Sequence, residues 1–389
     1  MDKTFIIRKV NESNVRSELV DIGFESSYLD VAKHKYKPFI LKIYNLTPPQ
    51  AMILKQTALS LGTDCATHRY IVTCKVKSSD VILFATANQL KKISTKLKLQ
   101  PFGLKTLAKN IDEFLVRKKI VFKIHDTVFD WHRTYLMGIL NITPDSFSDG
   151  GKYYEPESAY EHFNKLVQDG ADIIDIGGES TRPNFIPIES DEEISRVIPV
   201  IKKIRDVNTK TPISIDTRNP KTAQAAIDAG ANIINDVSGL LNDKNMISAA
   251  AQNDAVLVVA FNDDIKQGKN AIDETIKGLN RRIELCLDAG IKESRIILDP
   301  GLGFNKTSEQ NIELIKNARE VCSLPFACLY GISRKSFVQR LSEQTLADIE
   351  FANVALNSYL TTCGVNILRI HDVKAHKQAV NTLDKVIYD

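Results

Sequence analysis

Short apolar runs alternate with helical patterns through the last two thirds of the chain. Eight such runs, each of strand length, are centred near residues 137, 173, 213, 233, 256, 296, 327 and 367. Between them lie segments such as NPKTAQAAIDAG (219–230), which begins with an Asn cap and a first-turn Pro and ends on Gly. Eight strands alternating with helices predict an α/β fold, a (β/α)₈ TIM barrel over residues 135–389. An open doubly wound sheet is the alternative, but no GxGxxG follows a predicted strand.

The apolar runs belong to an internal repeat. Three segments share a glycine, a short apolar stretch and a polar residue five positions after the glycine: DGADIIDIGG (169–178), DAGANIINDV (228–237) and CGVNILRIHD (363–372). The polar residues are Asp175, Asn235 and Arg369, and a longer fourth copy (288–301) reaches Asp299. Successive glycines are spaced widely enough for two βα units, because one unit needs about 30 residues. The repeat therefore supports the count of eight strands.

Residues 1–120 carry a different pattern and are predicted to form a smaller α+β domain. Extended runs are expected near FIIRKV, FILKIYNL, HRYIVTCKV and VILFATA, and helices around 48–61 and 89–116, the latter broken at Pro101 and Gly103. A β-hairpin over 121–134, with His125-Asp126 at its turn, is expected to precede the barrel. We assign the first domain no role beyond a scaffold or an oligomer contact, such as a homodimer.

Composition excludes several classes of function. The six cysteines form no CxxC pair and no zinc-like spacing, so we expect reduced thiols and a cytoplasmic location. No signal-peptide-like segment opens the sequence and no window reaches the ~18 apolar residues of a membrane span, so we expect no membrane association. The net charge of +3 is small, and the lysines of 89–119 have no interleaved aromatics, so we expect no nucleic-acid partner.

Polar residues follow nearly every predicted strand, where the chemistry of such barrels is found. Each has an ordinary explanation alone, as a helix cap, a turn or a solvated side chain, but a barrel needs no such ring for stability. Asp216, Asn235 and Asp299 are rich in acceptors, which indicates a ligand edge with several N–H donors. Lys335, Arg369 and His371 are cationic and indicate an anion such as phosphate. Asn141 offers a neutral oxygen suited to Mg²⁺, and the ring as a whole predicts a flat heterocycle that carries phosphate or pyrophosphate.

The motifs at these strand ends resemble those of a known family. In order, they are MGILNITPDSFSDGG, GGESTRPN, IDTR, NDVSG, LDPGLGF, GISRKSF and RIHDV. This set is similar to that of the dihydropteroate synthases, the folate-pathway enzymes that sulfonamides inhibit, and covers residues 120–389. The resemblance implies a transferase that joins 6-hydroxymethyl-7,8-dihydropterin pyrophosphate to p-aminobenzoate, giving 7,8-dihydropteroate and pyrophosphate.

The resemblance also implies roles for individual residues. The pterin would be bound by Asp216, Asn235, Asp299 and Lys335. Mg²⁺ would lie at Asn141, and the pyrophosphate would contact Asn141, Arg182, Arg369 and His371. The p-aminobenzoate would lie against Thr181, Arg182, Pro183, Phe304 and Ser336. The catalytic set would be Asp149, Lys335, Arg369 and His371, with Asp149 stabilising a pterin cation after dissociative loss of pyrophosphate.

Two departures from the family pattern keep other functions open. After the fifth strand the family carries a Met-His-Met-like run, whereas this chain reads Val259-Ala260-Phe261-Asn262-Asp263-Asp264. Between the seventh and eighth strands, the family's Gly-Thr before the helix is replaced by Ser342-Glu343-Gln344-Thr345. One alternative is a methyltransferase that passes a methyl group from methyltetrahydrofolate to a corrinoid partner. The other is a catalytically silent pterin-binding paralogue.

Overall fold

The structure is a computed structural model that describes residues 6–142, 156–179, 187–240, 245–345 and 348–388. The chain divides into two compact units, Met1–Lys118 and Lys119–Asp389. Each unit has hydrophobic clusters of its own. None of the helices in the described ranges combines the length and the apolar character needed to cross a membrane.

The first unit is built on a three-stranded antiparallel sheet. Its strand order is β1-β3-β2, with β1 at Pro38–Leu46, β2 at Asp64–Ala66 and β3 at Ser79–Thr86. The helices are α1 (Val15–Asp21), α2 (Leu29–Ala32), α3 (Pro48–Leu59), α4 (Ala87–Leu97) and α5 (Leu104–Val116). Helix α4 begins with a capping box between Thr86 and Gln89, and Gly103 takes a left-handed backbone before α5. The predicted α+β class and the break between the two helices are confirmed.

Two predicted strands of this unit were wrong. Residues 6–10 of FIIRKV form no strand, and Ile6 and Ile7 are almost fully exposed. HRYIVTCKV forms consecutive turns, in which the backbone N–H of Ile71 donates to His68 O at 2.9 Å and that of Cys74 to Ile71 O at 3.1 Å. Cys74 has a φ of 54°, which a strand does not allow. Strand β3 pairs with β1 on one side, and its partner on the other side is the short β2.

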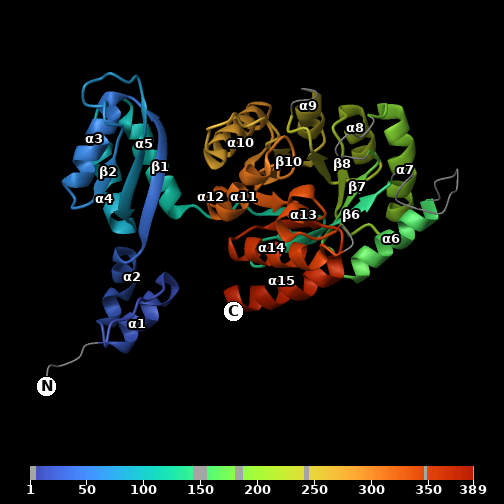
Figure 1. Ribbon diagram of the computed structural model, residues 1–389, viewed down its shortest axis with the longest axis horizontal. Helices are drawn as coiled ribbons and strands as arrows, with labels where there is room; N and C mark the ends of the chain where they lie inside the picture. Colours follow the sequence, from blue (N-terminus) through green and yellow to red (C-terminus); the bar gives the residue numbers. More distant parts are fainter. Residues whose placement is uncertain (1–5, 143–155, 180–186, 241–244, 346–347, 389) are drawn as a thin grey trace. The chain divides into compact units, whose positions relative to one another are not determined.

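The second unit is a closed parallel barrel, as predicted (Figure 1). Hydrogen bonding runs β6-β7-β8-β9-β10-β11-β12-β13 and back to β6, which excludes the open sheet. The strands are β6 (Tyr135–Asn141), β7 (Ile173–Gly177), β8 (Ile213–Asp216), β9 (Ile233–Asp236), β10 (Val256–Ala260), β11 (Ile296–Asp299), β12 (Ala327–Tyr330) and β13 (Ile367–Ile370).

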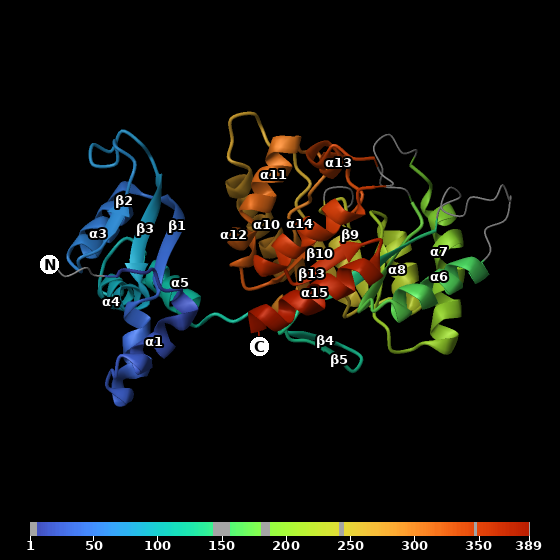
Figure 2. The same ribbon diagram turned by 60° about the horizontal axis from the view of Figure 1, so that its bottom comes forward.

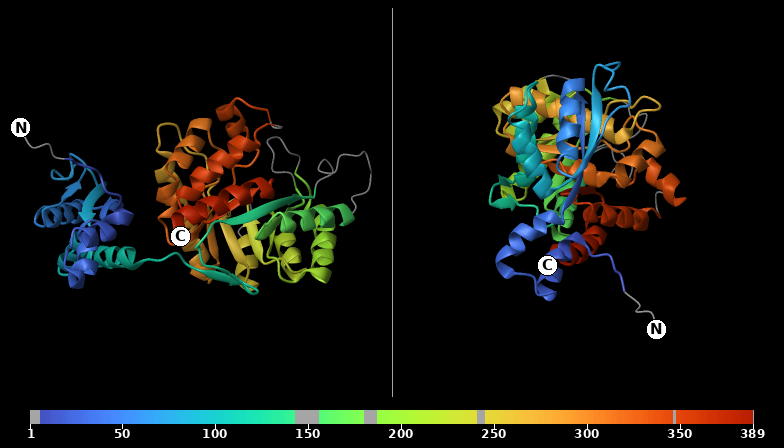
Figure 3. Two further views of the ribbon diagram at one scale, coloured as in Figure 1. Left: turned by 90° about the horizontal axis from the view of Figure 1, so that it is seen from below. Right: turned by 90° about the vertical axis from the view of Figure 1, so that its left-hand side faces the viewer.

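Helices surround the barrel strands on the outside (Figures 2 and 3). They are α6 (Pro156–Gln168), α7 (Ser190–Val207), α8 (Pro220–Asp228), α9 (Asn245–Gln252), α10 (Ala271–Asp288), α11 (Ser308–Lys316), α12 (Ala318–Cys322), α13 (Ser336–Ser342), α14 (Glu350–Thr362) and α15 (Val373–Tyr388). The segment after β11 forms two helices, α11 and α12, and the segment after β12 also forms two, α13 and α14.

A hydrophobic floor fills the amino-terminal half of the barrel interior. It combines inward side chains of the strands, including Ile173, Ile233, Ile297 and Ile367, with the hairpin β4 (Phe122–Ile124) and β5 (Thr127–Phe129). Because strand side chains alternate, the residue two positions further along each strand faces inward as well. Those residues are Asp175, Asn235, Asp299 and Arg369. The alternation therefore places a polar ring directly above an apolar floor.

Phe129 is the best single probe of this floor. Its side chain is fully buried, and its ring centroid lies 4.6 Å from that of Phe122 and 4.8 Å from that of Tyr135. We expect Phe129→Ala to lower the free energy of unfolding of the barrel by about 3–5 kcal/mol, through lost contacts and the cavity left behind. Val128→Ala, on the half-exposed neighbour, should change it by no more than about 0.5 kcal/mol. Equal effects in denaturant titrations would contradict the assignment of the hairpin to the core.

Candidate active site

The acceptor residues predicted from the sequence lie together at the carboxyl ends of the barrel strands. Asp216 ends β8, Asn235 lies on β9 and Asp299 ends β11, and their side chains are 6%, 2% and 9% exposed. Adjacent strands pair Asp216 with Asn235 in register. Burial raises the pKa of both Asp216 and Asp299, because a carboxylate loses its hydration there. Nearby cations oppose this rise, Arg369 at Asp216 and Lys335 at Asp299.

Arg369 lies between two of the carboxylates. Its Nε donates to Asp175 Oδ2 at 2.6 Å, and its Nη2 donates to Asp216 Oδ2. The sequence assigned Arg369 to an anion and Asp216 to the pterin, whereas in the structure the two pair with each other. A guanidinium is the natural partner here, because it offers the paired N–H groups that the acceptors were expected to bind.

Asp175 is a member of the ring to which the sequence reasoning gave no role. It is fully buried, and its Oδ2 accepts hydrogen bonds from Arg369 and, at 3.1 Å, from Asn235 Nδ2. Because Asp175 takes the amide N–H₂ of Asn235, it leaves the amide oxygen as the group available to a ligand. The repeat contained the signal, since Asp175 occupies the same position as Asn235 and Arg369 in their copies.

Lys335 and Phe304 lie side by side at another part of the ring. Lys335 Nζ is 4.4 Å from the centroid of the Phe304 ring and donates to Leu302 O. Burial lowers the pKa of Lys335 to about 8, while attraction to Asp299 opposes the fall. Gly303 allows this approach, because a Cβ there would lie 2.6 Å from Lys335 Cδ. Lys335, which was predicted to bind the pterin, therefore lies beside Phe304, which was predicted to contact p-aminobenzoate.

The remaining assignments fall partly outside the described residues. Asn141 ends β6 and is half-buried, and Gly177 is its close neighbour, since a Cβ there would be in contact with Asn141 Oδ1 at 3.7 Å. His371 Nδ1 lies 2.9 Å from Ser333 Oγ, and Ser336 is exposed at the start of α13. Four assigned residues lie outside the described ranges, namely Asp149, Thr181, Arg182 and Pro183.

A metal site made of protein groups alone is absent from the described part of the chain. No three histidine, cysteine or acidic side chains gather there in a way that could hold an ion. The donor that fits is Asn141, an amide oxygen that needs further ligands from phosphate and water to complete an octahedron.

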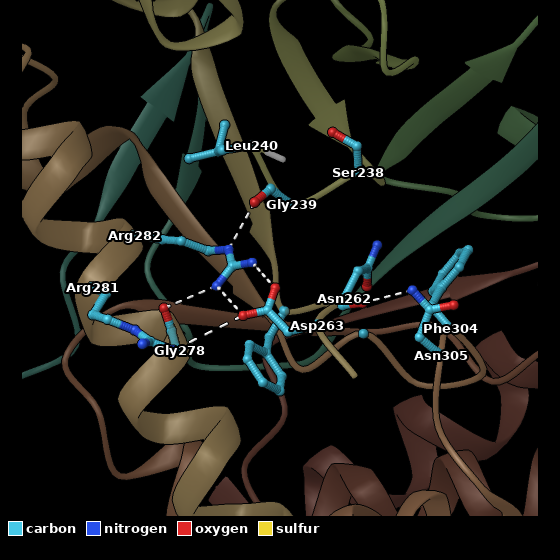
Figure 4. A network of polar contacts seen from close by, with 12 residues as sticks. Ser238, Gly239, Leu240, Asn262, Asp263, Gly278, Arg281, Arg282, Phe304 and Asn305 are labelled. Carbon is cyan, nitrogen blue, oxygen red and sulfur yellow. Dashed lines mark hydrogen bonds and ion pairs between the residues drawn. The ribbon is translucent and has the colours of Figure 1, made fainter. Parts of the chain in front are cut away.

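The residues after β10 that depart from the family pattern include Phe261, whose side chain faces helix α10 and not the polar residues of the site. The Phe261 ring packs on Gly278 of α10, where a Cβ would lie 2.2 Å from the ring. It lies between the charged ends of Arg282 and Lys306, 5.4 and 5.0 Å from its centroid. Figure 4 shows the adjoining polar contacts, in which Asp263 faces Arg282 and Asn305 reaches the backbone of Asn262.

Comparison with known proteins places the chain in a family. The family described as pterin binding enzyme matches residues 137–371. The dihydropteroate synthase of Clostridium beijerinckii is 41% identical over 258 residues, which are 66% of this chain and 95% of that protein.

Two solved structures are similar to the barrel. The structure of Clostridium difficile dihydropteroate synthase in the presence of pteroic acid is 40% identical, with a TM-score of 0.64, over 66% of this chain and 98% of that one. The structure of Xanthomonas albilineans dihydropteroate synthase with 4-aminobenzoic acid is 34% identical, with a TM-score of 0.66, over 70% of this chain and 100% of that one. The chain therefore belongs to the dihydropteroate synthase family of pterin binding enzymes.

Proposed function

We propose that this chain joins 6-hydroxymethyl-7,8-dihydropterin pyrophosphate to p-aminobenzoate, forming 7,8-dihydropteroate and releasing pyrophosphate in folate biosynthesis. The observation that carries the proposal is the convergence of three buried acceptors and two partly buried cations, Lys335 and Arg369, at one end of the barrel. The two solved structures named above were obtained in the presence of pteroic acid, the oxidised form of the proposed product, and with 4-aminobenzoic acid, the proposed acceptor substrate.

The pterin is expected to bind by exchange with Arg369. The aminopyrimidinone edge of a pterin presents N–H donors much as a guanidinium does, so it can replace Arg369 at Asp216. Asn235 and Asp299 supply further acceptors, and the buried position strengthens each hydrogen bond. Arg369 is then released to meet the pyrophosphate, together with His371.

The reaction itself needs charge stabilisation more than a strong base. The bond between the pterin methylene carbon and the pyrophosphate oxygen breaks, and its electron pair leaves with pyrophosphate. The lone pair of the aniline nitrogen then forms the new C–N bond, and its proton passes to solvent. Arg369 and His371 stabilise the leaving group, and we assign Asp149 to the pterin cation.

Mg²⁺ fits the donors at the end of β6. Asn141 would hold the ion, with pyrophosphate and water as the other ligands, and Mg²⁺ would supply charge neutralisation for the leaving group. We place p-aminobenzoate against Phe304, Lys335 and Ser336, with Thr181, Arg182 and Pro183 completing its site. A cytoplasmic location agrees with the free cysteines of the described chain.

The first test is turnover with variants of the pterin site. The purified chain with pterin pyrophosphate, Mg²⁺ and p-aminobenzoate should release pyrophosphate. Asp299→Ala and Lys335→Ala should each weaken pterin binding by about 10- to 100-fold, because each loses a charged hydrogen-bonding group. Asp206→Ala, on the exposed side of α7, is the matched control and should bind normally. Pterin binding without pyrophosphate release would favour the silent paralogue, and unchanged binding in either site variant would contradict the placement of the pterin.

The pH dependence tests the role of Lys335. Its pKa of about 8 lies below the usual lysine value, so the side chain loses its charge as the pH rises through 8. We expect kcat/KM for the pterin substrate to fall on the alkaline side of about pH 8. Lys335→Arg stays charged and should lack this limb even if it is slow. If the arginine variant shows the same alkaline fall in kcat/KM, the fall comes from the substrate or from another group of the protein and not from Lys335.

Truncation tests whether the first unit contributes to the chemistry. All assigned site residues lie after Lys118, so a chain that begins at Lys119 should keep its kcat and both KM values. A chain that begins at Val121 loses the hydrogen bonds of Lys119 to Phe326 O (2.7 Å) and of Ile120 to Pro325 O (2.8 Å), and should be less stable. A folded but inactive chain from Lys119 would contradict the view that residues 1–118 serve only as a scaffold or an oligomer contact. A sizing run on the full-length and truncated chains would show directly whether residues 1–118 form an oligomer contact.

A further inference from the structure

Arg282 is a buried arginine for which the reaction described above has no use. It lies on α10 and is 5% exposed. Its Nε donates to Gly239 O at 2.7 Å, its Nη1 donates to Gly278 O at 3.2 Å, and its Nη2 meets the carboxylate of Asp263 (Figure 4). The three nitrogens of the guanidinium thus donate to two loops and to its own helix.

The two loops that Arg282 joins follow adjacent barrel strands. Gly239 belongs to the segment after β9, and Asp263 to the segment after β10. Gly239 has a φ of 68°, and a Cβ there would lie 2.3 Å from Ala260 O, so the first segment lies directly against the end of β10. Only glycine fits at this distance. Arg282 therefore fixes the backbone where the two segments touch.

Other polar groups extend the connection to the segment after β11. Asn262 Nδ2 donates to Val237 O, and Asn305 Nδ2 donates to Asn262 O at 2.9 Å. Lys306 Nζ donates to three carbonyl oxygens, those of Phe261 (2.6 Å), Gly301 (2.9 Å) and Phe304 (3.2 Å). The three consecutive segments are held as one polar network.

This network begins directly after the pterin residues. Asn235 is followed by Asp236, whose carboxylate accepts from the backbone N–H groups of Ser238 (2.9 Å) and Leu240 (2.7 Å). Gly239, the partner of Arg282, lies between those two residues. A short turn, held by these two hydrogen bonds to Asp236, therefore connects Gly239 to the end of β9, and Arg282 is bonded to that turn.

A buried ion pair is a poor way to gain stability, because desolvation offsets most of its attraction. Its advantage is directional: a bidentate guanidinium sets the positions of its partners. We infer that Arg282, oriented by Asp263, is a positioning residue for the pterin, which acts through Gly239 on the end of β9 and on Asn235. The inference rests on the proposed function and adds a residue pair outside the assigned site.

The chain contains a matched control for this pair. Arg295 is also buried, at 8% exposed, and pairs with Asp254 just before β10 begins, whereas Asp263 follows the end of that strand. The acidic partners of the two arginines flank the same strand, but only Asp263, the partner of Arg282, lies at its carboxyl end. Arg282→Met and Arg295→Met remove the same groups at opposite ends of the barrel.

The experiment compares both KM values and the melting temperature in the full-length chain. We expect Arg282→Met to raise KM for the pterin pyrophosphate by about tenfold, as small displacements of binding groups do. KM for p-aminobenzoate should stay unchanged, and Arg295→Met should leave both KM values unchanged even where its melting temperature falls equally. An unchanged pterin KM in Arg282→Met, an equal rise in both KM values, or the same rise in Arg295→Met would overturn the inference.

A binding measurement separates this inference from the proposed function. Calorimetry with 6-hydroxymethylpterin needs no turnover, and Arg282→Met should raise Kd about tenfold there too. If the wild-type chain binds the pterin but forms no product, the proposed function fails, while the Kd comparison still decides the inference. If Arg282→Met does not fold, Arg282→Lys is measured by the same criteria, because lysine cannot make the bidentate contact.

Discussion

The site depends on one guanidinium placed between two buried carboxylates. Arg369 on β13 bonds Asp175 on β7 and Asp216 on β8, so strands separated by β6 are joined across the barrel interior. Charges so deeply buried are tolerated only when they are paired and hydrogen-bonded. The pairing holds both carboxylates in place, where a ligand that supplies the same donors could bind. We propose that pterin recognition is in this sense an exchange of one set of N–H groups for another.

The geometry of the strands explains why these charges meet. Four strands, β7, β9, β11 and β13, each place an isoleucine in the floor and a polar residue two positions later, as in Ile173 with Asp175 and Ile367 with Arg369. The floor is closed from below by the aromatic hairpin, so water is excluded from that side. A dry floor under a polar ring is what makes each hydrogen bond at the ring strong and specific. Fold stability and ligand recognition thus share these strands.

Much of the barrel and of its polar ring was predictable from the sequence, because each copy of the repeat is a short continuous segment. Its glycine, apolar stretch and polar residue fix the strand, its end and the inward-facing position within ten residues of sequence. What failed depended on distant partners or on turns. HRYIVTCKV has strand-like residues, but Cys74 takes a left-handed backbone, and Ile71 is buried in the core while Val76 packs against it in part. Arg282 looks like one more charge on an amphipathic helix, and only the tertiary structure brings it to Gly239 and Asp263.

The departure after β10 also has a physical explanation that the sequence did not reveal. Phe261 faces α10, and the polar residues that follow it connect three loops. Polar contacts of this kind hold backbone groups at fixed distances, which apolar packing does less strictly. The altered run is therefore compatible with an intact pterin site.

The most direct test of the account is a crystal structure of the chain with pterin pyrophosphate bound. The account predicts that the pterin edge contacts Asp216, Asn235 and Asp299, and that Arg369 has moved from Asp216 to the pyrophosphate. A pterin bound elsewhere, or an Arg369 that still bonds Asp216 in the complex, would contradict it.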